Sequence, residues 1–442
     1  MPATKRRALV IWAAAVAVYL LAVFNRTSLG VAGLQAAERF HVGPAALGVF
    51  TVLQVGVYAA MQIPTGLLVD RFGPRRVLVA AALAMGVGQL LFALAPTYSI
   101  AVIARGVLGF GDAMTFVSVL RLVAAHFSSR RYASIASLTA AVGSIGNLAA
   151  TVPLTLLLSH AGWVATFAVT GSVTMVYAVV VGLRVRDTPE GAPAHRSDAT
   201  TVRALLAQVR DAWRTPGTRL GFWVHFSTMF APAVLGLLWG FPYLVSAQGM
   251  SESAAGAVLS LLVVVGGVTG PIVGETISRK PEWRVPMVAA FLALSIGVWA
   301  VLLGWPGGVV PVPLVIVAFS FVSLGGPLSG VGFAIARDYN PLFRVGTASG
   351  VVNVGGFAAI TVTTLGIGLL LGGDAAAADA NSFRVAFTTI AAMLLLGAWR
   401  TGVWWRRARA LVLVAGARGE EVPVQIRRRS WDIPAHAGSV AS

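Results

Sequence analysis

GLLVDRFGPRR, residues 66–76, is a short charged connection between two long apolar segments. Gly66 has no side chain and therefore allows a neighbouring helix to approach closely. The carboxylate of Asp70 can interact with the positive N-terminus of a helix or with an arginine. Arg75 and Arg76 favour the side of a membrane on which basic residues accumulate. The stretch therefore predicts a polar turn between two membrane-spanning helices.

The composition around this turn is that of a membrane protein. The chain has 442 residues, of which 57% are hydrophobic and 11% charged, and its mean hydropathy is +0.82. Because a helix needs about 20 apolar residues to cross the hydrocarbon core, this length has room for about twelve spans. Apolar runs bounded by charges or by Gly/Pro turns predict spans at 9–32, 45–69, 76–95, 99–125, 132–158, 163–183, 220–247, 253–277, 285–304, 311–336, 345–371 and 383–405.

The net charge of +17 could indicate a partner such as nucleic acid or acidic lipid. The positions of the basic residues favour another interpretation. All but four of the 33 Lys and Arg residues fall on one side of the predicted spans or near the span ends on that side; Arg39 and Arg384 lie on the other side, and Arg26 and Arg105 lie deeper inside spans. This asymmetry is the positive-inside rule, so the charge reports topology and we expect no nucleic-acid partner. Both termini are then cytoplasmic, in an inner membrane.

The predicted spans form two groups of six. We expect an N-terminal six-helix bundle over 1–183, a cytoplasmic linker over 184–219 with an amphipathic helix at 202–213, a C-terminal bundle over 220–405, and a basic, disordered tail over 406–442. A weak internal echo supports a repeat, since GLLVDR at 66–71 corresponds to GETISR at 274–279. Two such halves are typical of transporters whose substrate site lies between repeats.

The 66–76 stretch resembles the loop signature of the major facilitator superfamily between its second and third helices. The resemblance implies the major facilitator fold, all-α with twelve transmembrane helices in two pseudo-symmetric halves, and a transporter that works as a monomer. It also implies that the loop acts as a conformational latch. The residues that carry this role are Gly66, Asp70, Arg71, Gly73, Arg75 and Arg76.

Two further stretches resemble the same superfamily. RGVLGFGDA, from Arg105 to Ala113, is similar to a fourth-helix pattern, and in the anion:cation symporter branch the position of Asp112 usually carries a glutamate that takes part in proton coupling. NRTSLGVA in the first span resembles that branch too, but Asn25 stands where an acid is common, so Asn25 cannot share the coupling. Gly346–Asn353 resembles the start of the superfamily's eleventh helix.

Ionisable groups inside a span need a partner or a wet cavity. Asp112 is either a proton or substrate site or a structural partner of an arginine. Arg26 either contacts substrate or extends its side chain to the outer interface, and Arg105 either takes part in proton coupling or is a structural partner. Arg121 is assigned to the basic residues that anchor the topology.

Uncharged polar side chains complete the candidate site. Gln54, Tyr58 and Gln62 recur every four residues and therefore share one helix face. Asn147 and Asn353 lie near the middle of their spans, where either substrate contact or interhelical hydrogen bonding explains an isolated asparagine. We assign these five residues and Arg26 to substrate binding, and Asp112 with Arg105 to proton coupling.

These residues favour a proton-coupled secondary transporter of a small polar solute, such as an organic anion or zwitterion. The alternative is a proton-driven efflux antiporter, although GSIGN at 143–147 lacks the proline that such exporters tend to carry in the fifth span. An enzyme is not expected, because the sequence contains no GxxxxGK[ST] or HExxH motif. No cofactor or metal is expected, and the absence of cysteine excludes thiolate ligands and disulfides.

Overall fold

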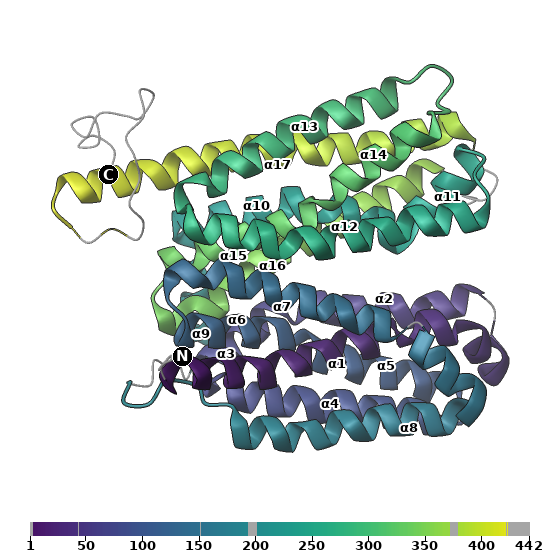
Figure 1. The fold of residues 1–442 in the computed structure, drawn as a ribbon, viewed down its shortest axis with the longest axis horizontal. Helices are drawn as coiled ribbons and strands as arrows, with labels where there is room; N and C mark the ends of the chain where they lie inside the picture. Colours follow the sequence, from purple (N-terminus) through teal and green to yellow (C-terminus); the bar gives the residue numbers. More distant parts are fainter. Residues whose placement is uncertain are drawn as a thin grey trace. The chain divides into compact units, whose positions relative to one another are not determined.

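The computed structural model describes residues 3–42, 44–150, 152–192, 201–371, 379–420 and 422, and these residues form helices and turns without a strand. The N-terminal half (Figure 1) comprises α1 (Ala3–Phe40), α2 (Pro44–Ala60), α3 (Gln62–Phe72), α4 (Pro74–Leu94), α5 (Tyr98–Ala113), α6 (Thr115–His126), α7 (Ser129–Ala149) and α8 (Val152–Arg184). The expected linker helix is present as α9 (Val202–Arg214), which confirms that prediction.

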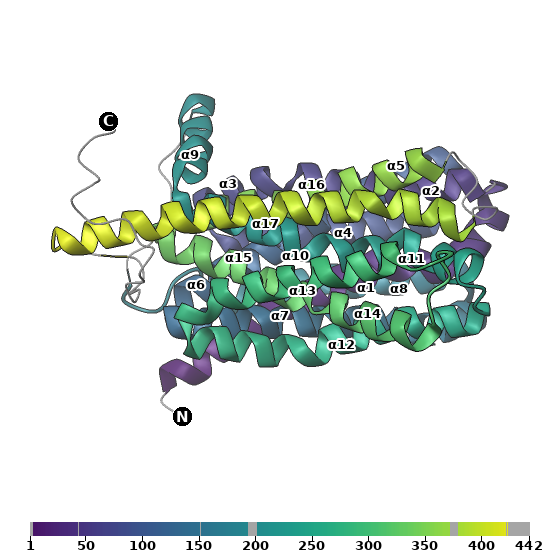
Figure 2. The ribbon, with the colours of Figure 1, turned by 90° about the horizontal axis from the view of Figure 1, so that it is seen from above.

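The C-terminal half repeats the pattern. It comprises α10 (Pro216–Val234), π-helical turns at Leu235–Trp239 and Tyr243–Ala247 around α11 (Gly240–Pro242), α12 (Glu252–Arg279), α13 (Arg284–Gly304), α14 (Val312–Ser323), α15 (Gly325–Tyr339), α16 (Val345–Leu371) and α17 (Ala380–Ala417). Figure 2 shows that α17 is one long helix. It continues beyond the boundary expected at residue 405, so the described residues 406–417 of the expected tail are helical, and 423–442 lie outside the described residues.

The expectation of twelve spans is confirmed. In the part of the chain that the structure describes, ten helical segments are long and apolar enough to cross a membrane, and the pair Val52–Ala60 and Gln62–Phe72, bent by 48°, makes an eleventh. The more polar α7 is not among these segments, and it lies where the sequence predicts the span at 132–158. Gly162, with φ of +74°, separates the last residues of this span from the next span inside α8.

Several spans are interrupted, and the interruptions recur in both halves. α5 and α6 form one span broken at Met114, and α14 and α15 form one span broken at Leu324. At each break the backbone N–H bonds to a carbonyl three residues earlier, a tighter turn than the α-helix makes. Met114 lies two residues after Asp112, so the first break is next to a candidate site residue.

Residues that contact one another most densely form two compact units. One contains Met1–Ser128, Leu138–Arg210 and Leu342–Gly350, and the other contains Ser129–Ser137, Asp211–Pro341 and Val351–Ser442. Each unit has its own aromatic core. The core of the first unit contains Phe40, Phe50, Phe92 and Trp163. The core of the second unit contains Tyr243, Phe319, Phe383, Phe387 and Trp299. These cores hold the helices that carry the polar residues described next.

Candidate functional site

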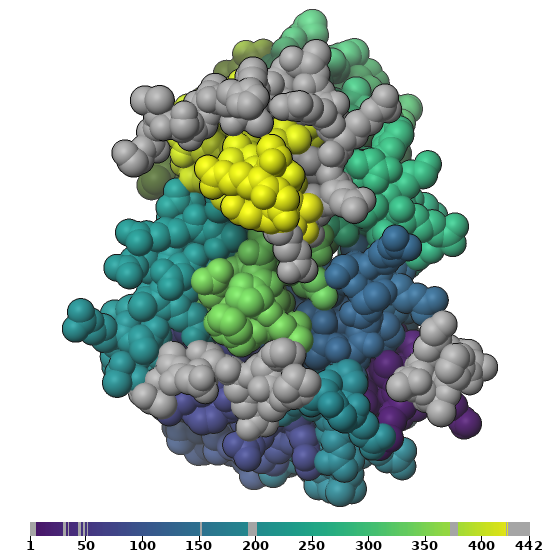
Figure 3. All heavy atoms as spheres, turned by 90° about the vertical axis from the view of Figure 1, so that its left-hand side faces the viewer, coloured from purple at the N-terminus to yellow at the C-terminus, as the bar shows by residue number. Residues whose placement is uncertain are grey.

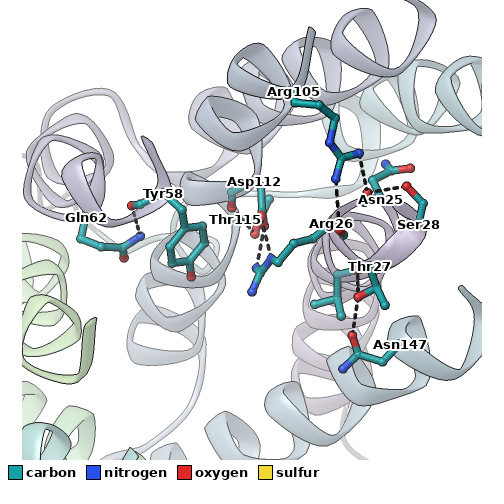
Figure 4. A network of polar contacts seen from close by, with 11 residues as sticks. Asn25, Arg26, Thr27, Ser28, Tyr58, Gln62, Arg105, Asp112, Thr115 and Asn147 are labelled. Carbon is teal, nitrogen blue, oxygen red and sulfur yellow. Dashed lines mark hydrogen bonds and ion pairs between the residues drawn. The ribbon is translucent and has the colours of Figure 1, made fainter. Parts of the chain in front are cut away.

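Arg26 and Asp112 form a two-bond ion pair in the first unit. Nε of Arg26 donates to Oδ2 of Asp112 over 2.7 Å, and Nη2 donates to Oδ1 over 2.8 Å. The side chain of Asp112 is fully buried, whereas that of Arg26 remains 32% exposed. Figure 4 shows the two groups pointing toward each other from α1 and α5. The structure therefore brings together the two charged residues for which the sequence left a pairing open.

The local backbone presents Asp112 at a helix end. Asp112 is the second-last residue of α5, and its carbonyl accepts a hydrogen bond from Oγ1 of Thr115 over 2.8 Å. Gly109 and Gly111 precede it on α5. A Cβ at Gly109 would lie 2.8 Å from the carbonyl oxygen of Gln54, so only glycine allows α5 to approach α2 this closely.

Tyr58 extends the pair on the side of α2. The guanidinium carbon of Arg26 lies 4.7 Å from the centre of the Tyr58 ring, which is the geometry of a cation–π contact. Gln62 donates to the backbone carbonyl of Tyr58 over 2.8 Å. Gln54 is 2% exposed, and its amide nitrogen has no hydrogen-bond partner among the described residues. The polar face predicted on this span thus contributes one residue, Tyr58, directly to the ion pair.

Arg105 holds the backbone of α1. Its two terminal nitrogens donate to the carbonyl oxygens of Asn25 and Arg26 over 3.3 and 3.2 Å, and its guanidinium lies 5.3 Å from the centre of the Phe92 ring. The side chain is 1% exposed. Arg105 therefore contacts the main chain of Arg26, whose side chain forms the ion pair with Asp112.

Neighbouring polar residues attach α1 to two other helices. Asn25 is buried and donates to Oγ1 of Thr174 on α8 over 3.1 Å. Thr27 donates to Oδ1 of Asn147 on α7 over 2.6 Å. Asn147 thus contacts Thr27, the residue that follows Arg26 on α1. The sequence did not single out Thr27 or Thr174, because a threonine in a span commonly bonds to its own helix.

Asn353 belongs to the second unit. It lies 3% exposed on α16, and its Oδ1 is 3.1 Å from Nε2 of His225 on α10. The other ring nitrogen of His225 is 3.3 Å from the carbonyl oxygen of Ser329. The interhelical hydrogen bond that the sequence offered as one explanation of Asn353 is therefore present.

Asp70 caps the start of α16. Its Oδ1 accepts from the backbone N–H of Gly346 over 2.9 Å, and its Oδ2 accepts from the N–H and from Oγ1 of Thr347, each over 2.7 Å. These N–H groups lie in the first turn of a helix, where no intrahelical acceptor exists. A Cβ at Gly66 would lie 2.5 Å from the carbonyl oxygen of Gly346. Both properties expected of the 66–76 stretch, the close approach and the carboxylate at a helix N-terminus, are thus confirmed.

Two residues of this contact escaped the sequence analysis. Arg121 was assigned to the topological anchor, but it is 3% exposed and its Nε lies 3.6 Å from Oδ1 of Asp70, so that assignment is corrected. Gln208 on α9 donates to Oγ1 of Thr347 over 2.7 Å and to Oδ2 of Asp70 over 3.3 Å. The amphipathic pattern of α9 predicted a buried face but not its partner.

The rest of the 66–76 stretch packs within the same unit. Gly73 has φ of +84°, and a Cβ there would collide with the carboxylate of Asp187, which also accepts from the backbone N–H of Arg75 over 2.8 Å. The guanidinium of Arg71 lies 5.0 Å from the centre of the Phe72 ring, and Arg76 is exposed.

The GETISR echo makes corresponding contacts in the second unit. Ser278, the counterpart of Asp70, accepts from the backbone N–H of Ser134 on α7 over 2.7 Å. Glu275 accepts from the hydroxyl of Ser134 over 2.8 Å. A Cβ at Gly274, the counterpart of Gly66, would collide with the side chain of Ser137. The stretches at 66–71 and 274–279 therefore both contact the first half of another helix, which the sequence similarity alone left open.

No cluster of three or more metal-ligating His, Asp or Glu side chains occurs in the described ranges. The Arg26–Asp112 site is an ion pair with polar neighbours. Such a pair can exchange a proton or an anionic ligand, because each charge requires a partner when buried.

Known proteins of similar sequence are transporters. The probable sulfoacetate transporter SauU of Cupriavidus necator is 26% identical over 400 residues, covering 86% of this chain and 90% of the relative. The probable galactarate/D-glucarate transporter GarP of Escherichia coli K12 is 24% identical, covering 84% and 88%. The methyl viologen resistance protein SmvA of Salmonella typhimurium is 28% identical over 274 residues, covering 50% of this chain and 54% of that protein.

Solved structures share the fold. The proton:xylose symporter XylE superposes with a TM-score of 0.65 at 16% identity, covering 90% of this chain and 95% of that chain. The human organic anion transporter MFSD10 superposes with a TM-score of 0.66 at 16% identity, covering 91% and 100%. Residues 15–364 match the sequence profile described as Major Facilitator Superfamily. The chain belongs to the Major Facilitator Superfamily and is a multi-pass membrane protein of the secondary transporter class.

Proposed function

We propose that this transporter couples the movement of a small organic anion to that of a proton, with Arg26 as the anion site and Asp112 as the proton site. The observation that carries the proposal is their two-bond ion pair, formed between side chains 86 residues apart in sequence. A guanidinium offers paired donors that match a carboxylate, and an oxoanion of the solute can take the same two positions.

The ion pair supplies a reason for coupling. Protonation of Asp112 removes its negative charge, so the half-buried guanidinium of Arg26 loses its counter-ion inside a membrane span. Leaving such a charge unpaired is costly, and an anionic solute offsets the cost by binding to Arg26. The proton and the anion thus favour each other's binding, which produces symport. Return of the anion to solution restores the pair after Asp112 releases its proton.

The surrounding residues have supporting roles in this proposal. Tyr58 holds the guanidinium through its ring face while Asp112 is protonated. Arg105 takes part in coupling as a positioning residue, because it fixes the carbonyl oxygens of α1 beside Arg26. Polar contacts to the remainder of the solute are assigned to Gln54, Gln62, Asn147 and Asn353.

The relatives support an anionic solute. Sulfoacetate, galactarate and D-glucarate, which appear in the names of the similar transporters, are all small hydrophilic organic anions. Each carries oxoanion groups that can accept two parallel hydrogen bonds from a guanidinium. We therefore propose sulfonates and carboxylates of this size as the substrate class, with zwitterions as the wider group.

The 66–76 stretch acts as a latch in the proposed cycle. The contact of Asp70 with Gly346 and Thr347 holds the start of α16 in one conformation and must break for alternating access. We further propose an inner-membrane location with cytoplasmic termini, from the positive-inside asymmetry, and a monomeric protein without a nucleic-acid partner.

Proton movement into proteoliposomes tests the function directly. Purified protein is reconstituted with an internal pH dye, and sulfoacetate, D-glucarate, amino acids, dipeptides and methyl viologen are added in turn. We expect an organic anion to acidify the interior with wild-type protein and not with Asp112→Asn. The matched control is Asp187→Asn, because Asp187 is also a carboxylate of the first unit but contacts Arg75.

Counterflow separates the two roles of the site. With the same anion on both sides and no pH gradient, Asp112→Asn should still exchange labelled anion, since Arg26 is then always available. Arg26→Gln, in contrast, should lose this exchange. Acidification that persists in Asp112→Asn at the wild-type rate would refute Asp112 as the proton site.

Efflux of a cation is the second candidate function, and the similarity to the methyl viologen resistance protein favours it. In that case methyl viologen, and no anion, would drive proton movement in the opposite direction. Asp112 would then bind the cation, and the proposed role of Arg26 would be wrong.

A further inference from the structure

Arginine and tryptophan side chains alternate between the first half of α10 and the second half of α17. On α17, Arg400, Trp404 and Arg407 lie four and three residues apart and therefore share one helix face. The guanidinium of Arg219 on α10 lies 4.6 Å from the centre of the Trp404 ring, and that of Arg407 lies 4.7 Å from it. Arg400 lies 5.0 Å from the ring of Trp223 on α10. We call these five residues the arginine–tryptophan cluster.

The charges of this cluster have one sign. The charged groups that act on Arg219 are Arg407, Arg400 and Arg214. In the part of the chain that the structure describes, no ion pair joins Arg219, Arg400 or Arg407 to a carboxylate. Like charges held close together repel one another, so the arrangement favours an anion between them.

Buried hydrogen-bond donors without a partner also favour an anion at this cluster. Nε1 of Trp223, Nε1 of Trp404 and Nε of Arg400 are buried without an acceptor among the described residues. Trp404 is 6% exposed, so water has little access to it. Buried polar groups normally have partners, and all three orphaned groups here are N–H donors. The missing partner is therefore an acceptor, and the arginines require it to be negative.

The position of the cluster indicates where the anion comes from. Arg400 also lies 5.5 Å from the ring of Trp399, which is 63% exposed, and Leu395 one turn earlier is 55% exposed. These apolar side chains are suited to lipid chains, and tryptophan with arginine is typical of the membrane interface. Figure 3 shows the face of the molecule at which α17, in yellow, ends.

We propose that the arginine–tryptophan cluster binds the phosphate of an anionic phospholipid headgroup in the cytoplasmic leaflet. The leaflet follows from the orientation proposed above, whereas the lipid site is independent of the transported solute. Arg219, Arg400 and Arg407 bind the phosphate oxygens, the indole N–H groups donate to them, and the acyl chains lie along Leu395 and Trp399.

Native mass spectrometry of the full-length protein in detergent tests this site. The protein is titrated with phosphatidylglycerol, with phosphatidylcholine of the same acyl chains, and with inorganic phosphate. Removing both charges in Arg400→Gln/Arg407→Gln should weaken phosphatidylglycerol binding about 25-fold, at about fivefold for each arginine near a membrane surface. The matched control is Arg406→Gln/Arg418→Gln, which removes two exposed charges outside the cluster, one on α17 and one directly after its end.

A charge-preserving variant guards against a folding defect. Arg400→Lys/Arg407→Lys should retain most of the affinity for phosphatidylglycerol, and the control pair should match wild type. Equal binding by wild type and Arg400→Gln/Arg407→Gln would overturn the proposal, as would an equal loss in the control pair. Equal affinity for phosphatidylcholine would refute the requirement for an anionic headgroup. If inorganic phosphate displaces phosphatidylglycerol at similar concentration, the site takes free phosphate and its assignment to lipid is wrong.

Discussion

Replacing Asp70 by asparagine should loosen the start of α16 without changing the size of the side chain. The carboxylate accepts hydrogen bonds through both oxygens, from Gly346 on one and from Thr347 twice on the other. An amide has only one acceptor oxygen, because its nitrogen donates. The variant therefore loses at least the bond from the Gly346 N–H and the negative charge beside Arg121.

The magnitude follows from these contacts. A hydrogen bond to a charged group contributes about 1.5 to 3 kcal/mol, and a negative charge at a helix N-terminus adds about 0.3 to 1 kcal/mol. The sum is about 3 kcal/mol, which corresponds to an increase on the order of 100-fold in the equilibrium for opening this contact. The barrier to the conformational change of the proposed latch should also be lower in the variant than in the wild type.

A single introduced cysteine measures that opening without background, since the chain contains no cysteine. Ser349 on α16 is a suitable position, because its side chain is fully buried and its hydroxyl has no hydrogen-bond partner among the described residues. In a Ser349→Cys background, the rate of N-ethylmaleimide labelling should rise on the order of 100-fold with Asp70→Asn, following the open population.

Two results would refute this reasoning. The first is a labelling rate within about threefold of the Ser349→Cys parent, which would mean that the contact contributes less than about 1 kcal/mol. The second is an equal increase with Asp187→Asn, which removes a carboxylate that does not cap α16. Unchanged elution of each variant as a single folded species at the labelling temperature establishes that labelling reports local opening.

The other predictions concern the ion pair and the close helix contacts. Gly66→Ala should cost about 1 to 3 kcal/mol by overpacking against the first turn of α16, measured as a lower melting temperature and faster labelling of the same reporter. Arg26→Lys keeps the charge but cannot form two parallel bonds to Asp112, so half-saturation for anion-driven acidification should rise at least about tenfold, the equivalent of one charged hydrogen bond. Ser278→Ala should remove the hydrogen bond from the Ser134 N–H and lower the unfolding free energy by about 1 kcal/mol, clearly less than the effect expected at the Asp70 contact.

The candidate residues divide into those with a local signal in the sequence and those without one. Asp70 was predictable because a carboxylate between two glycines at the end of a span is unusual in a chain with 11% charged residues. Asp112 and Arg26 were recognisable as candidates because each is an ionisable group inside an apolar run. Gln208 had no such signal, since a glutamine on an amphipathic helix is ordinary until its partner is known.

Arg121 shows why position along the chain can mislead. It lies near a basic loop, and this proximity suggested an anchoring role, yet helix α6 turns its side chain inward to Asp70. Asn353 shows that a residue can be recognised in the sequence while its partner cannot. The sequence offered two explanations, and the histidine that contacts it, 128 residues earlier, could not be chosen from the pattern.

The sequence by itself determined the number of spans and the family, and it predicted the side of the membrane on which the basic residues lie. Each of these depends on properties that are local along the chain, namely the apolar length needed to cross a bilayer, the charges between spans, and a contiguous motif. Only the tertiary structure decided that Arg26 pairs with Asp112, that Asp70 caps α16, and that Arg105 holds the main chain of α1. These contacts depend on the rotation of each helix about its axis and on its register against its neighbours, and close packing of side chains from distant segments sets both.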